Sequence, residues 1–407
     1  AHVYPHDGLP GPAIGFLQEA LRWWDQWLKE IHTGILDEPM YRVWMQESVP
    51  PKSFYDERPG RWVAETSWPS PRIATKRLVL NPGRLGAEPE SETQLTLRSP
   101  QTIGHSAGDW CSFGVAGDLP ADQQEDDRTS LVFDSLSLGE RFEILGAPVV
   151  MLELAVDRPL AFVAVRLNDV AQDGSSTRVT YGLLNLTHRV SHEHPERLEP
   201  GQRYHVPVRL NDIAHAFLTG HRIRVAISTS YWPVAWPSPE PVTLTVITGA
   251  SVLELPVRPP DPQDRLLSPL GEPECASSPK PTELRPMPAH RTIMRDPATN
   301  ETVYTVSDEG GESNQAALAR LDSINLEVGH RILKRFRISE ADPLSARAEV
   351  VQITIFKRGT WSVRIETRTY FSASVDAFNL QATLAAYEGQ TRVFSKEWDC
   401  SLPRDMM

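Results

Sequence analysis

The chain has 407 residues, enough for two or three domains, and its 40% hydrophobic content is that of an ordinary globular protein. A net charge of −12, with the positive residues scattered along the chain, argues against a nucleic-acid partner. The three cysteines are too few and too widely separated for a disulfide framework or a zinc cluster, and they suit a reducing cytoplasm. The longest apolar stretches are too short to cross a bilayer, so we expect no membrane partner.

The segment GPAIGFLQEALRWWDQWLKEIHTG predicts an amphipathic helix over residues 12–31. Apolar residues recur at steps of three and four on one face, at Ile14, Leu17, Leu21, Trp24, Leu28 and Ile31. Trp23 and Trp27 widen this apolar face. We therefore expect the helix to pack against a large partner surface.

Downstream of this helix the hydrophobic period changes to two, which is typical of β-strands. The predicted strands are residues 40–46, 76–80, 149–156, 161–170, 177–190, 203–210, 221–229, 242–247 and 251–257. Many short strands without intervening helices indicate a mainly β fold of the β-sandwich or jelly-roll type.

A proline-rich stretch over residues 258–288 reads as an extended connector or a surface wrap. A second β-rich region follows it. Residues 350–356 and 361–367 predict a hairpin with Gly359 in the turn, and the segments FNLQATLAAYEG and TRVFSKEW predict further strands.

The string Gly104-His105-Ser106-Ala107-Gly108 fits the G-x-S-x-G pattern of a nucleophile elbow. An elbow needs a strand before the serine and a helix after it. Pro100 interrupts the preceding segment, and two glycines, a proline and an acidic cluster follow the pattern. We therefore predict a loop with a chance match, and keep Ser106 as nucleophile only as an alternative.

Three further motifs could suggest metal sites. NDVAQDG (168–174) places Asp169 and Asp173 before Gly174 but has no closing glutamate, so a hairpin turn at Asp173-Gly174 is predicted instead of a calcium loop. Glu125-Asp126-Asp127 is interpreted as a solvated acidic loop, not a cation site. HEHPE (192–196) lacks the helical HExxH spacing and predicts a turn. We expect no metal and no cofactor.

The aromatic run SYWPVAWPSPEP (230–241) sets two tryptophans in a loop constrained by prolines. Trp232 and Trp236 could line a binding cleft, or they could plug the join between two domains. The residues alone leave both interpretations open, and we carry both tryptophans as candidate substrate-binding residues.

Several segments, in the same order, resemble the C-terminal part of the CocE/NonD hydrolases, a family of serine esterases and peptidases that includes X-Pro dipeptidyl-peptidases. They are AHVYPH at the start, ALRWWDQWLK (20–29), GRWVAETSWPSP (60–71), DDRTSLVFDS (126–135), VAVRLNDVAQDGSSTRVTYGLLN (163–185) and LTGHRIRVAISTSYWPVAWPSP (218–239). The resemblance covers residues 1–257 and is weaker from residue 290 onward.

The resemblance implies an α/β-hydrolase domain with an inserted cap, followed by a jelly-roll domain of galactose-binding-like type. The expected division is 1–75 for the C-terminal remnant of the hydrolase domain, 76–257 for the jelly roll, 258–289 for the linker and 290–407 for a β-rich extension. In the family the catalytic histidine follows a Gly-Pro-Trp segment, which makes His2 the matching residue, with His6 as the competing choice. The family's serine and aspartate match nothing in this chain, so we expect both to precede residue 1.

The expected function is therefore that of the C-terminal portion of a serine hydrolase that cleaves ester or amide bonds, X-Pro dipeptide bonds included, by acyl transfer. The partner would be a small ester or peptide substrate, and homo-oligomers are allowed for. Without the nucleophile this chain alone is expected to be inactive. The alternative is a non-catalytic jelly-roll module that binds carbohydrate or a protein partner. The tryptophan-rich helix discriminates between the two, because a standalone binding module would not carry an unburied helix of that kind.

Overall fold

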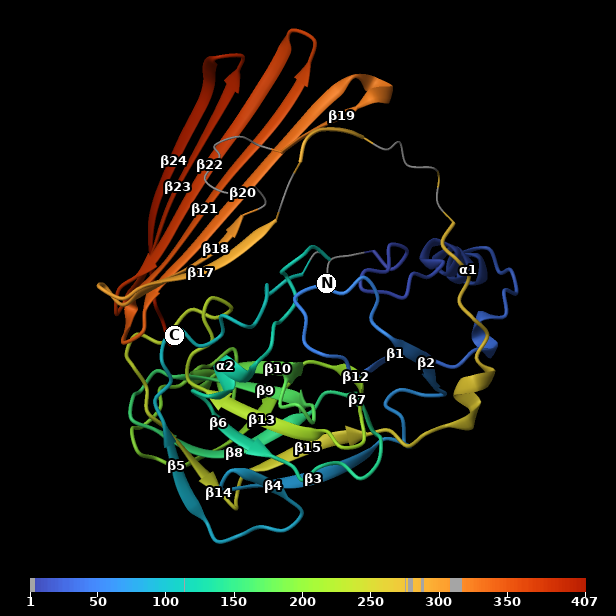
Figure 1. Ribbon diagram of the computed structural model, residues 1–407, viewed down its shortest axis with the longest axis vertical. Helices are drawn as coiled ribbons and strands as arrows, with labels where there is room; N and C mark the ends of the chain where they lie inside the picture. Colours follow the sequence, from blue (N-terminus) through green and yellow to red (C-terminus); the bar gives the residue numbers. More distant parts are fainter. Residues whose placement is uncertain (1–3, 113, 275, 277–280, 287–288, 308–316) are drawn as a thin grey trace. The chain divides into compact units, whose positions relative to one another are not determined.

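The computed structural model describes residues 4–112, 114–274, 276, 281–286, 289–307 and 317–407, and these form two compact units (Figure 1). The N-terminal unit comprises residues 1–99, 106–229 and 243–275, and the C-terminal unit comprises residues 100–105, 230–242 and 276–407. Two short segments of the first 250 residues therefore belong to the C-terminal unit. Each unit is described by itself.

The N-terminal unit is built almost entirely from strands. Its helical elements are α1 (Phe16–Leu28), η1 (Ile35–Asp37), α2 (Gln124–Asp127), η2 (Leu186–His188) and η3 (Pro262–Leu266). Its strands are β1 (Tyr41–Glu47), β2 (Gly60–Glu65), β3 (Ala74–Asn81), β4 (Arg84–Gly86), β5 (Thr93–Leu97), β6 (Leu131–Asp134), β7 (Phe142–Gly146), β8 (Val149–Val156), β9 (Phe162–Val170), β10 (Ser176–Asn185), β11 (Tyr204–Arg209), β12 (Ile213–Phe217), β13 (Arg222–Ser228), β14 (Leu244–Thr248) and β15 (Val252–Val257).

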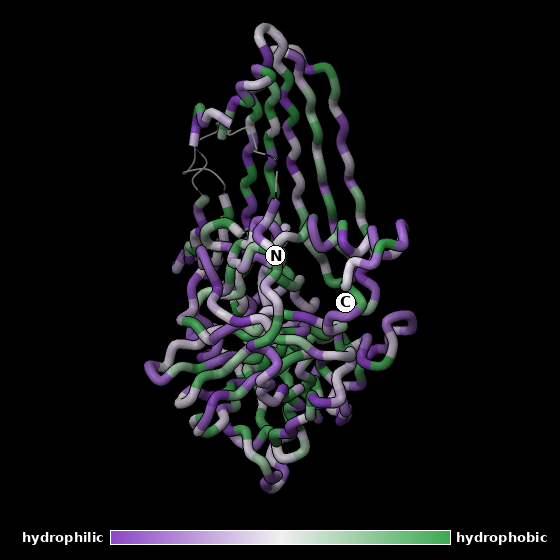
Figure 2. Tube along the Cα trace, turned by 90° about the vertical axis from the view of Figure 1, so that its right-hand side faces the viewer, coloured by the Kyte–Doolittle hydropathy of each residue, from purple (hydrophilic) through white to green (hydrophobic). Residues whose placement is uncertain are grey.

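Hydrogen bonding joins these strands along the order β10-β9-β13-β6-β4-β3-β15-β7-β12-β1-β2, and β8, β14, β5 and β11 branch from β15. The pairing is antiparallel except for β1 with β12 and β4 with β6. Figure 2 shows hydrophobic residues concentrated inside this unit. The alternation along β8, where every second residue is buried, shows how a period-two sequence places one face of a strand in the core.

The C-terminal unit is an antiparallel sheet of long strands. Its elements are β16 (Thr282–Arg285), β17 (His290–Asp296), β18 (Glu301–Ser307), β19 (Ala317–Leu321), η4 (Asp322–Ile324), β20 (Leu326–Ser339), β21 (Asp342–Arg358), β22 (Trp361–Ala373), β23 (Ala377–Glu388) and β24 (Thr391–Pro403). The strand order is β16-β19-β20-β21-β22-β23-β24, and β18 joins β20 to β17.

The structure confirms the mainly β class and every strand predicted from periodicity. The predicted hairpin is β21–β22, with Gly359 in its turn at φ +58°. The sequence analysis missed several strands, among them β7 and β12, because five-residue strands are too short to show a period. Among the described residues, no helix is long and apolar enough to span a membrane.

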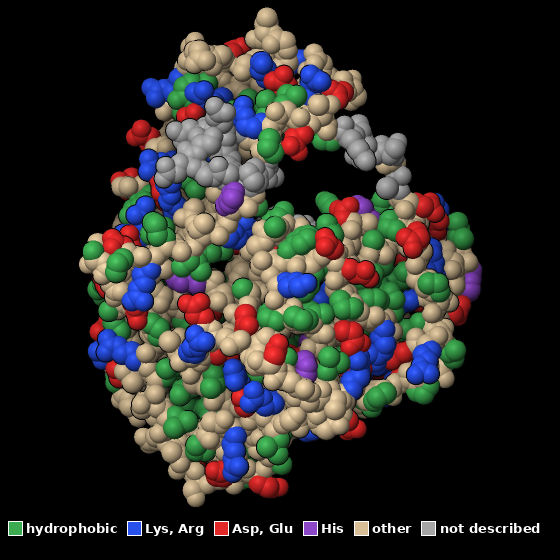
Figure 3. All heavy atoms as spheres, in the orientation of Figure 1, with side chains coloured by type: hydrophobic (Ala, Val, Ile, Leu, Met, Phe, Trp, Pro, Cys, Tyr) green, Lys and Arg blue, Asp and Glu red, His purple; other side chains and the backbone are tan. Residues whose placement is uncertain are grey.

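The visible face of the N-terminal unit carries acidic and basic side chains interspersed with hydrophobic ones, without a basic stripe (Figure 3). This distribution agrees with the scattered positive charges of the sequence.

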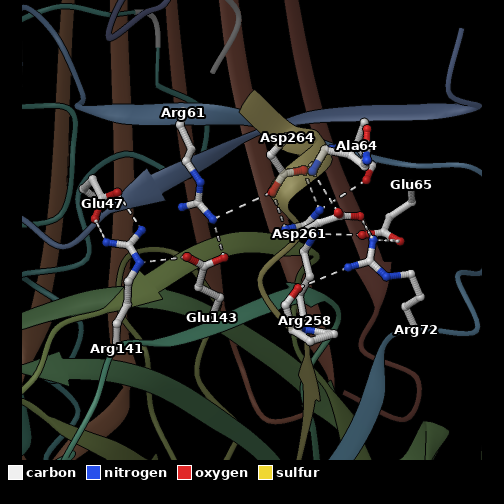
Figure 4. Close-up of polar contacts among 12 residues, drawn as sticks. Glu47, Arg61, Ala64, Glu65, Arg72, Arg141, Glu143, Arg258, Asp261 and Asp264 are labelled. Atoms are coloured by element: carbon white, nitrogen blue, oxygen red, sulfur yellow. Dashed lines mark hydrogen bonds and ion pairs between the residues drawn. The ribbon is translucent and has the colours of Figure 1, made fainter. Parts of the chain in front are cut away.

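A chain of ion pairs connects β2, β7 and the segment that follows β15 (Figure 4). At its centre the guanidinium of Arg258 is completely buried; its Nε lies 2.7 Å from Oε1 of Glu65, and its Nη2 lies 2.8 Å from Oδ1 of Asp264. Arg61 lies 2.8 Å from Glu143, whose other oxygen is 2.7 Å from Nε of Arg141. The network holds the start of the proline-rich connector against the sheet.

Arg258→Met removes a buried cation and leaves the carboxylates of Glu65 and Asp264 buried without it. We expect the free energy of unfolding of the N-terminal unit to fall by about 3–5 kcal/mol, measured by urea denaturation followed by circular dichroism. Arg77→Met is the matched control, because its pair with Glu254 is on the surface (3.3 Å; Arg77 side chain 65% exposed) and should be worth less than about 1 kcal/mol. Equal effects of the two substitutions would contradict this account.

Candidate functional site

Helix α1 presents its apolar residues to solvent. None of its residues is buried, and the large apolar side chains from Phe16 to Leu28 are between 39% and 72% exposed. They are Phe16, Leu17, Leu21, Trp23, Trp24, Trp27 and Leu28. Apolar surface of this extent on a folded unit marks an interaction surface. The predicted helix is confirmed, and within the described residues its expected partner surface is not supplied.

The start of α1 is fixed by the proline-rich connector. The backbone N–H of Gly15 donates to the carbonyl of Gly271 at 2.6 Å, and Nε2 of Gln18 donates to the carbonyl of Glu272 at 2.8 Å. These two bonds hold the helix at a defined position on the N-terminal unit.

The predicted catalytic residue His2 lies outside the described residues. Its competitor, His6, is half-buried, stacks on Tyr4 with ring centroids 5.3 Å apart, and has Nε2 3.9 Å from the carboxylate of Asp7. The assignment of the catalytic histidine therefore stays a prediction.

Ser106 lies in a run of turns, as the sequence analysis predicted. Its carbonyl accepts bonds from the N–H of Ala121 (3.1 Å) and Nε2 of Gln123 (2.8 Å). Apart from residue 113, which is not described, no helix occurs between β5 and α2, so the strand–turn–helix context of a nucleophile elbow is absent there.

The local backbone structure requires glycine at both glycine positions of the Ser106 motif. Gly104 has φ +108°, and a Cβ there would lie 2.7 Å from the carbonyl oxygen of Trp232. Gly108 has φ +71°, and a Cβ there would lie 2.6 Å from the backbone of Leu119. Close backbone approach explains why the pattern occurs at this position.

Trp232 and Trp236 lie in an aromatic cluster of the C-terminal unit. Trp232 is 1% exposed, packs edge-on against Trp236 at 5.2 Å, and also contacts Phe336 of β20 at 6.0 Å. Trp236 contacts Phe371 of β22 at 4.6 Å. The indole N–H groups of both tryptophans are buried and have no hydrogen-bond partner among the described residues. Both tryptophans thus pack in the C-terminal unit, and their contact with a substrate stays a prediction.

A group of serine, histidine and aspartate side chains, the residue types of a hydrolase triad, surrounds Asp169 on β9. Its Oδ2 lies 3.1 Å from Nε2 of His215 on β12, and its Oδ1 lies 2.7 Å from Nδ1 of His221, just before β13. The hydroxyl of Ser48, which follows β1, lies 3.5 Å from the same Nδ1 of His221. Four segments of the N-terminal unit therefore meet at one carboxylate.

This arrangement of serine, histidine and aspartate is not a catalytic triad. In a triad the two ring nitrogens of the histidine divide the contacts, one to the serine and one to the carboxylate. Here Nδ1 of His221 faces both partners. The group therefore binds segments together and lacks the divided contacts of a triad histidine.

Burial and hydrogen bonding set the charges of the Asp169 group. Burial alone would raise the pKa of Asp169, but hydrogen bonds, chiefly from His215, outweigh it and leave that pKa below its ordinary value. Burial lowers the pKa of His215, and the nearby charge of Arg58 acts in the same direction, against the opposing effects of Asp169 and Glu47. At neutral pH the pair is thus a carboxylate beside a neutral imidazole.

The prediction of a solvated loop at Glu125-Asp126-Asp127 is wrong. These residues form part of α2, in which Asp126 and Asp127 are only 4% and 5% exposed. Asp127 lies 3.0 Å from Nη1 of Arg166, itself fully buried on β9. The missed signal is an arginine inside the otherwise apolar run AFVAVRL, because a buried cation requires buried carboxylates.

The other predicted turns are confirmed. Asp173-Gly174 forms the turn between β9 and β10, with Gly174 at φ +89° and Oδ1 of Asp173 accepting from the N–H of Ser175. HEHPE is a bend, and Nδ1 of His192 lies 3.3 Å from Nδ1 of His188. In the described part of the chain, no three or more His, Cys, Asp or Glu side chains are grouped to hold a metal ion.

Comparison with known protein families shows which family this chain belongs to. The sequence profile described as "X-Pro dipeptidyl-peptidase C-terminal non-catalytic domain" matches residues 33–303, well over half of the chain. The chain belongs to this family. The resemblance to CocE/NonD hydrolases read from the sequence is thereby confirmed, and the chain covers mostly the non-catalytic C-terminal domain of such enzymes.

Two relatives are esterases by name. The cocaine esterase of Rhodococcus sp. (strain MB1 Bresler) is 27% identical over 188 residues, which cover 42% of this chain and 32% of the esterase. A protein of Mycobacterium bovis named as a serine esterase is 26% identical over 250 residues, covering 56% of this chain and 38% of that protein. The matched regions thus span about a third of the length of these relatives.

Solved structures show a similar level of likeness. An aminopeptidase from a marine-sediment Thaumarchaeota archaeon has a TM-score of 0.48 and 20% identity, covering 58% of this chain and 43% of its own. A CocE/NonD family hydrolase from Staphylococcus aureus has a TM-score of 0.46 and 16% identity, covering 60% and 45%.

The matched range of the X-Pro dipeptidyl-peptidase C-terminal domain contains the Asp169 group, Arg166 and Arg258, and leaves α1 outside. The name non-catalytic agrees with an Asp169 group that holds strands together. The sequence analysis named Asp169 only as part of a possible calcium loop and did not connect it with His215 or His221, because β9, β12 and β13 are separated in the sequence and these side chains meet only in the folded unit.

The Asp169 group predicts a pH dependence of stability. Because the pKa of His215 is lowered in the folded state, the unfolded chain binds its proton first, so stability is lost as the pH falls below about 6.5. The lowered pKa of Asp169 predicts a second loss below about 4. His215→Gln should abolish the first loss in urea-unfolding free energies measured from pH 7.5 to 5.

Two controls keep this measurement specific. Burial also lowers the pKa of His105, in the C-terminal unit, to about 4, so the series is run in a His105→Gln background. His194→Gln, at an exposed position, should leave the pH dependence unchanged. A pH dependence that survives in His215→Gln would contradict the assignment.

We predict that removal of the Trp232 side chain destabilises the C-terminal unit. Trp232→Ala would open a cavity beside Trp236 and Phe336, and we expect a loss of about 3–5 kcal/mol in the free energy of unfolding. Trp361→Ala, at a position 46% exposed at the start of β22, should cost less than about 1 kcal/mol. Unchanged stability of the Trp232 variant would show that this side chain is not part of the packed core.

Proposed function

We propose that this chain is the C-terminal portion of a CocE/NonD-type serine hydrolase that cleaves ester or amide bonds of small substrates by acyl transfer. The catalytic serine and aspartate would be supplied by an α/β-hydrolase domain that this chain does not contain. Ester and X-Pro dipeptide substrates are both within the proposal, since relatives are named for esterase and peptidase activities.

The observation that carries the proposal is the exposed apolar face of α1. A free-standing carbohydrate-binding module would have no use for a tryptophan-rich helix in solvent, whereas a helix at the edge of a hydrolase domain buries such a face against the neighbouring sheet. The hydrogen bonds from Gly15 and Gln18 to the connector present that face in a fixed position.

We also propose the finer domain assignment. Residues 1–75 would complete the hydrolase domain, residues 76–257 would form a jelly roll of galactose-binding-like type, residues 258–289 would be the linker, and residues 290–407 would be a β-rich extension. The mainly antiparallel strand pairing of the N-terminal unit, with β9 buried along its entire length, supports a layered β-sandwich. The β1–β2 hairpin would then bridge the two parts, since β1 pairs with β12.

In the proposed reaction His2 acts as general base towards the serine and then as general acid towards the leaving group. The serine attacks the carbonyl carbon, the acyl–oxygen or acyl–nitrogen bond breaks, and water later releases the acyl group from the serine. Trp232 and Trp236 are proposed to border the substrate.

The test compares this chain with the gene product that contains it together with the sequence encoded upstream of Ala1. The longer protein should hydrolyse p-nitrophenyl acetate, and His2→Ala in it should lower kcat by at least about a thousandfold with little change in KM. The 407-residue chain alone should show no hydrolysis that depends on Ser106.

His6→Ala is the matched variant in the longer protein and should retain activity within a few-fold. A His6 variant that loses activity while the His2 variant keeps it would move the assignment to His6. Activity of the 407-residue chain that disappears in Ser106→Ala would overturn the proposal altogether.

A further inference from the structure

The C-terminal sheet carries a groove of about 1010 Å³ on one face, and the described residues that line it belong to β17, β18, β20, β21 and β22. Its volume is at the upper end of small-molecule sites. These lining residues, all within residues 290–368, include none of the residues assigned to the proposed hydrolase site.

Strand register sets the order of side chains across the groove. Leu333 of β20 lies opposite Ser307 of β18 on one side and Val351 of β21 on the other, and Val351 in turn lies opposite Arg368 of β22. Opposite residues of antiparallel strands share a face of the sheet. Leu333 and Val351 therefore form an apolar centre, which Val303 of β18 extends.

Arginines surround this apolar centre. Arg331 and Arg335 lie two residues before and after Leu333 on β20, so their side chains stand on the same face, with Cα atoms about 7 Å from that of Leu333. Arg368 lies beside Val351. Arg331 is only 7% exposed, which places a guanidinium at the edge of a partly apolar surface.

The carboxylates of the groove leave donor capacity on Arg335 and Arg337. Arg335 and Arg368 share one partner, Glu349: Nη2 of Arg368 bonds to it at 2.5 Å, whereas Nη1 of Arg335 is 3.6 Å away, beyond hydrogen-bond distance. Arg337 is likewise 3.6 Å from Glu301. Among the described residues, the lining contains four arginines against three carboxylates, the third being Asp296, in a protein whose net charge is −12.

We propose that this groove binds an amphiphilic anion, an alkyl carboxylate whose head group is held by Arg335 and its neighbouring arginines and whose chain lies along Leu333 and Val351. A guanidinium presents parallel N–H donors that match a carboxylate, and the apolar centre of the groove favours an anion that carries an alkyl chain over a purely polar one. The ligand class follows from these two features together, because neither a cation nor a neutral polar molecule would satisfy both.

Isothermal titration calorimetry of the full chain with dodecanoate, below its micellar concentration, tests this proposal. Dodecanoate should bind at one site, and dodecyltrimethylammonium and acetate should each bind at least about tenfold more weakly. Arg335→Gln should weaken dodecanoate binding about tenfold, and Arg335→Lys less than that, because the charge remains while the paired donors are lost. Leu333→Asp should abolish binding.

Arg358→Gln is the matched control, because Arg358 lies at the exposed end of β21 outside the groove. This variant should bind dodecanoate with the same affinity as the unaltered chain. The thermal unfolding midpoint of each variant verifies folding, and the two Arg335 variants keep the test valid if Leu333→Asp does not fold. Equal affinities for the anionic and cationic amphiphiles, or an Arg335→Gln variant that binds like the unaltered chain, would overturn the proposal.

Discussion

The buried guanidinium of Arg258 is the constraint on which the arrangement of the N-terminal unit depends. A fully buried cation is tolerated only when carboxylates and carbonyls surround it, and these come from two different segments, Glu65 and Ala64 on β2 and Asp264 on η3. Hydrophobic residues in place of Arg258 and both of its carboxylate partners together could provide as much stability, but they would not select the position of η3. We infer that the contribution of Arg258 is geometric: it determines where the connector leaves β15 and which side of β2 it crosses.

The position of the connector also determines the position of the exposed helix α1. The connector begins at Arg258, runs through η3 and reaches Gly271 and Glu272, whose carbonyls accept hydrogen bonds from the start of α1. The apolar face of α1 is therefore presented by the same segment that the buried ion pairs hold in place. A domain called non-catalytic can contribute to catalysis in this way, by holding a rigid apolar surface for a neighbouring domain, and the proposed function depends on that surface more than on any single polar group.

The sequence predicted those features that local patterns encode. Period-two alternation located the strands from β8 to β11, and the three- and four-residue steps located α1, because both patterns are written in consecutive residues. The ionic groups were not predictable in this way. Asp169 and His215 are 46 residues apart, and Glu65 and Arg258 are 193 apart, so only the sheet topology brings them together. A buried arginine within an apolar strand, as at Arg166, is the one local sign that such a group exists.

In the C-terminal sheet, successive side chains of a strand point to opposite faces, and each face carries its own group of side chains. On β20, Phe336 points to the face that Trp232 covers, while its neighbours Arg335 and Arg337 point to the groove. The aromatic cluster fixes the backbone of β20 from one side, and the spacing of the guanidiniums on the other side follows from that fixed backbone. Trp232 and Trp236 reach this cluster from a loop some hundred residues earlier in the chain than β20, constrained by the Trp232–Pro233 bond and by the contact with Gly104. Trp232 and Trp236, for which the sequence left a cleft wall and a plug between domains both open, thus support the backbone that carries the charged surface on the opposite face of β20.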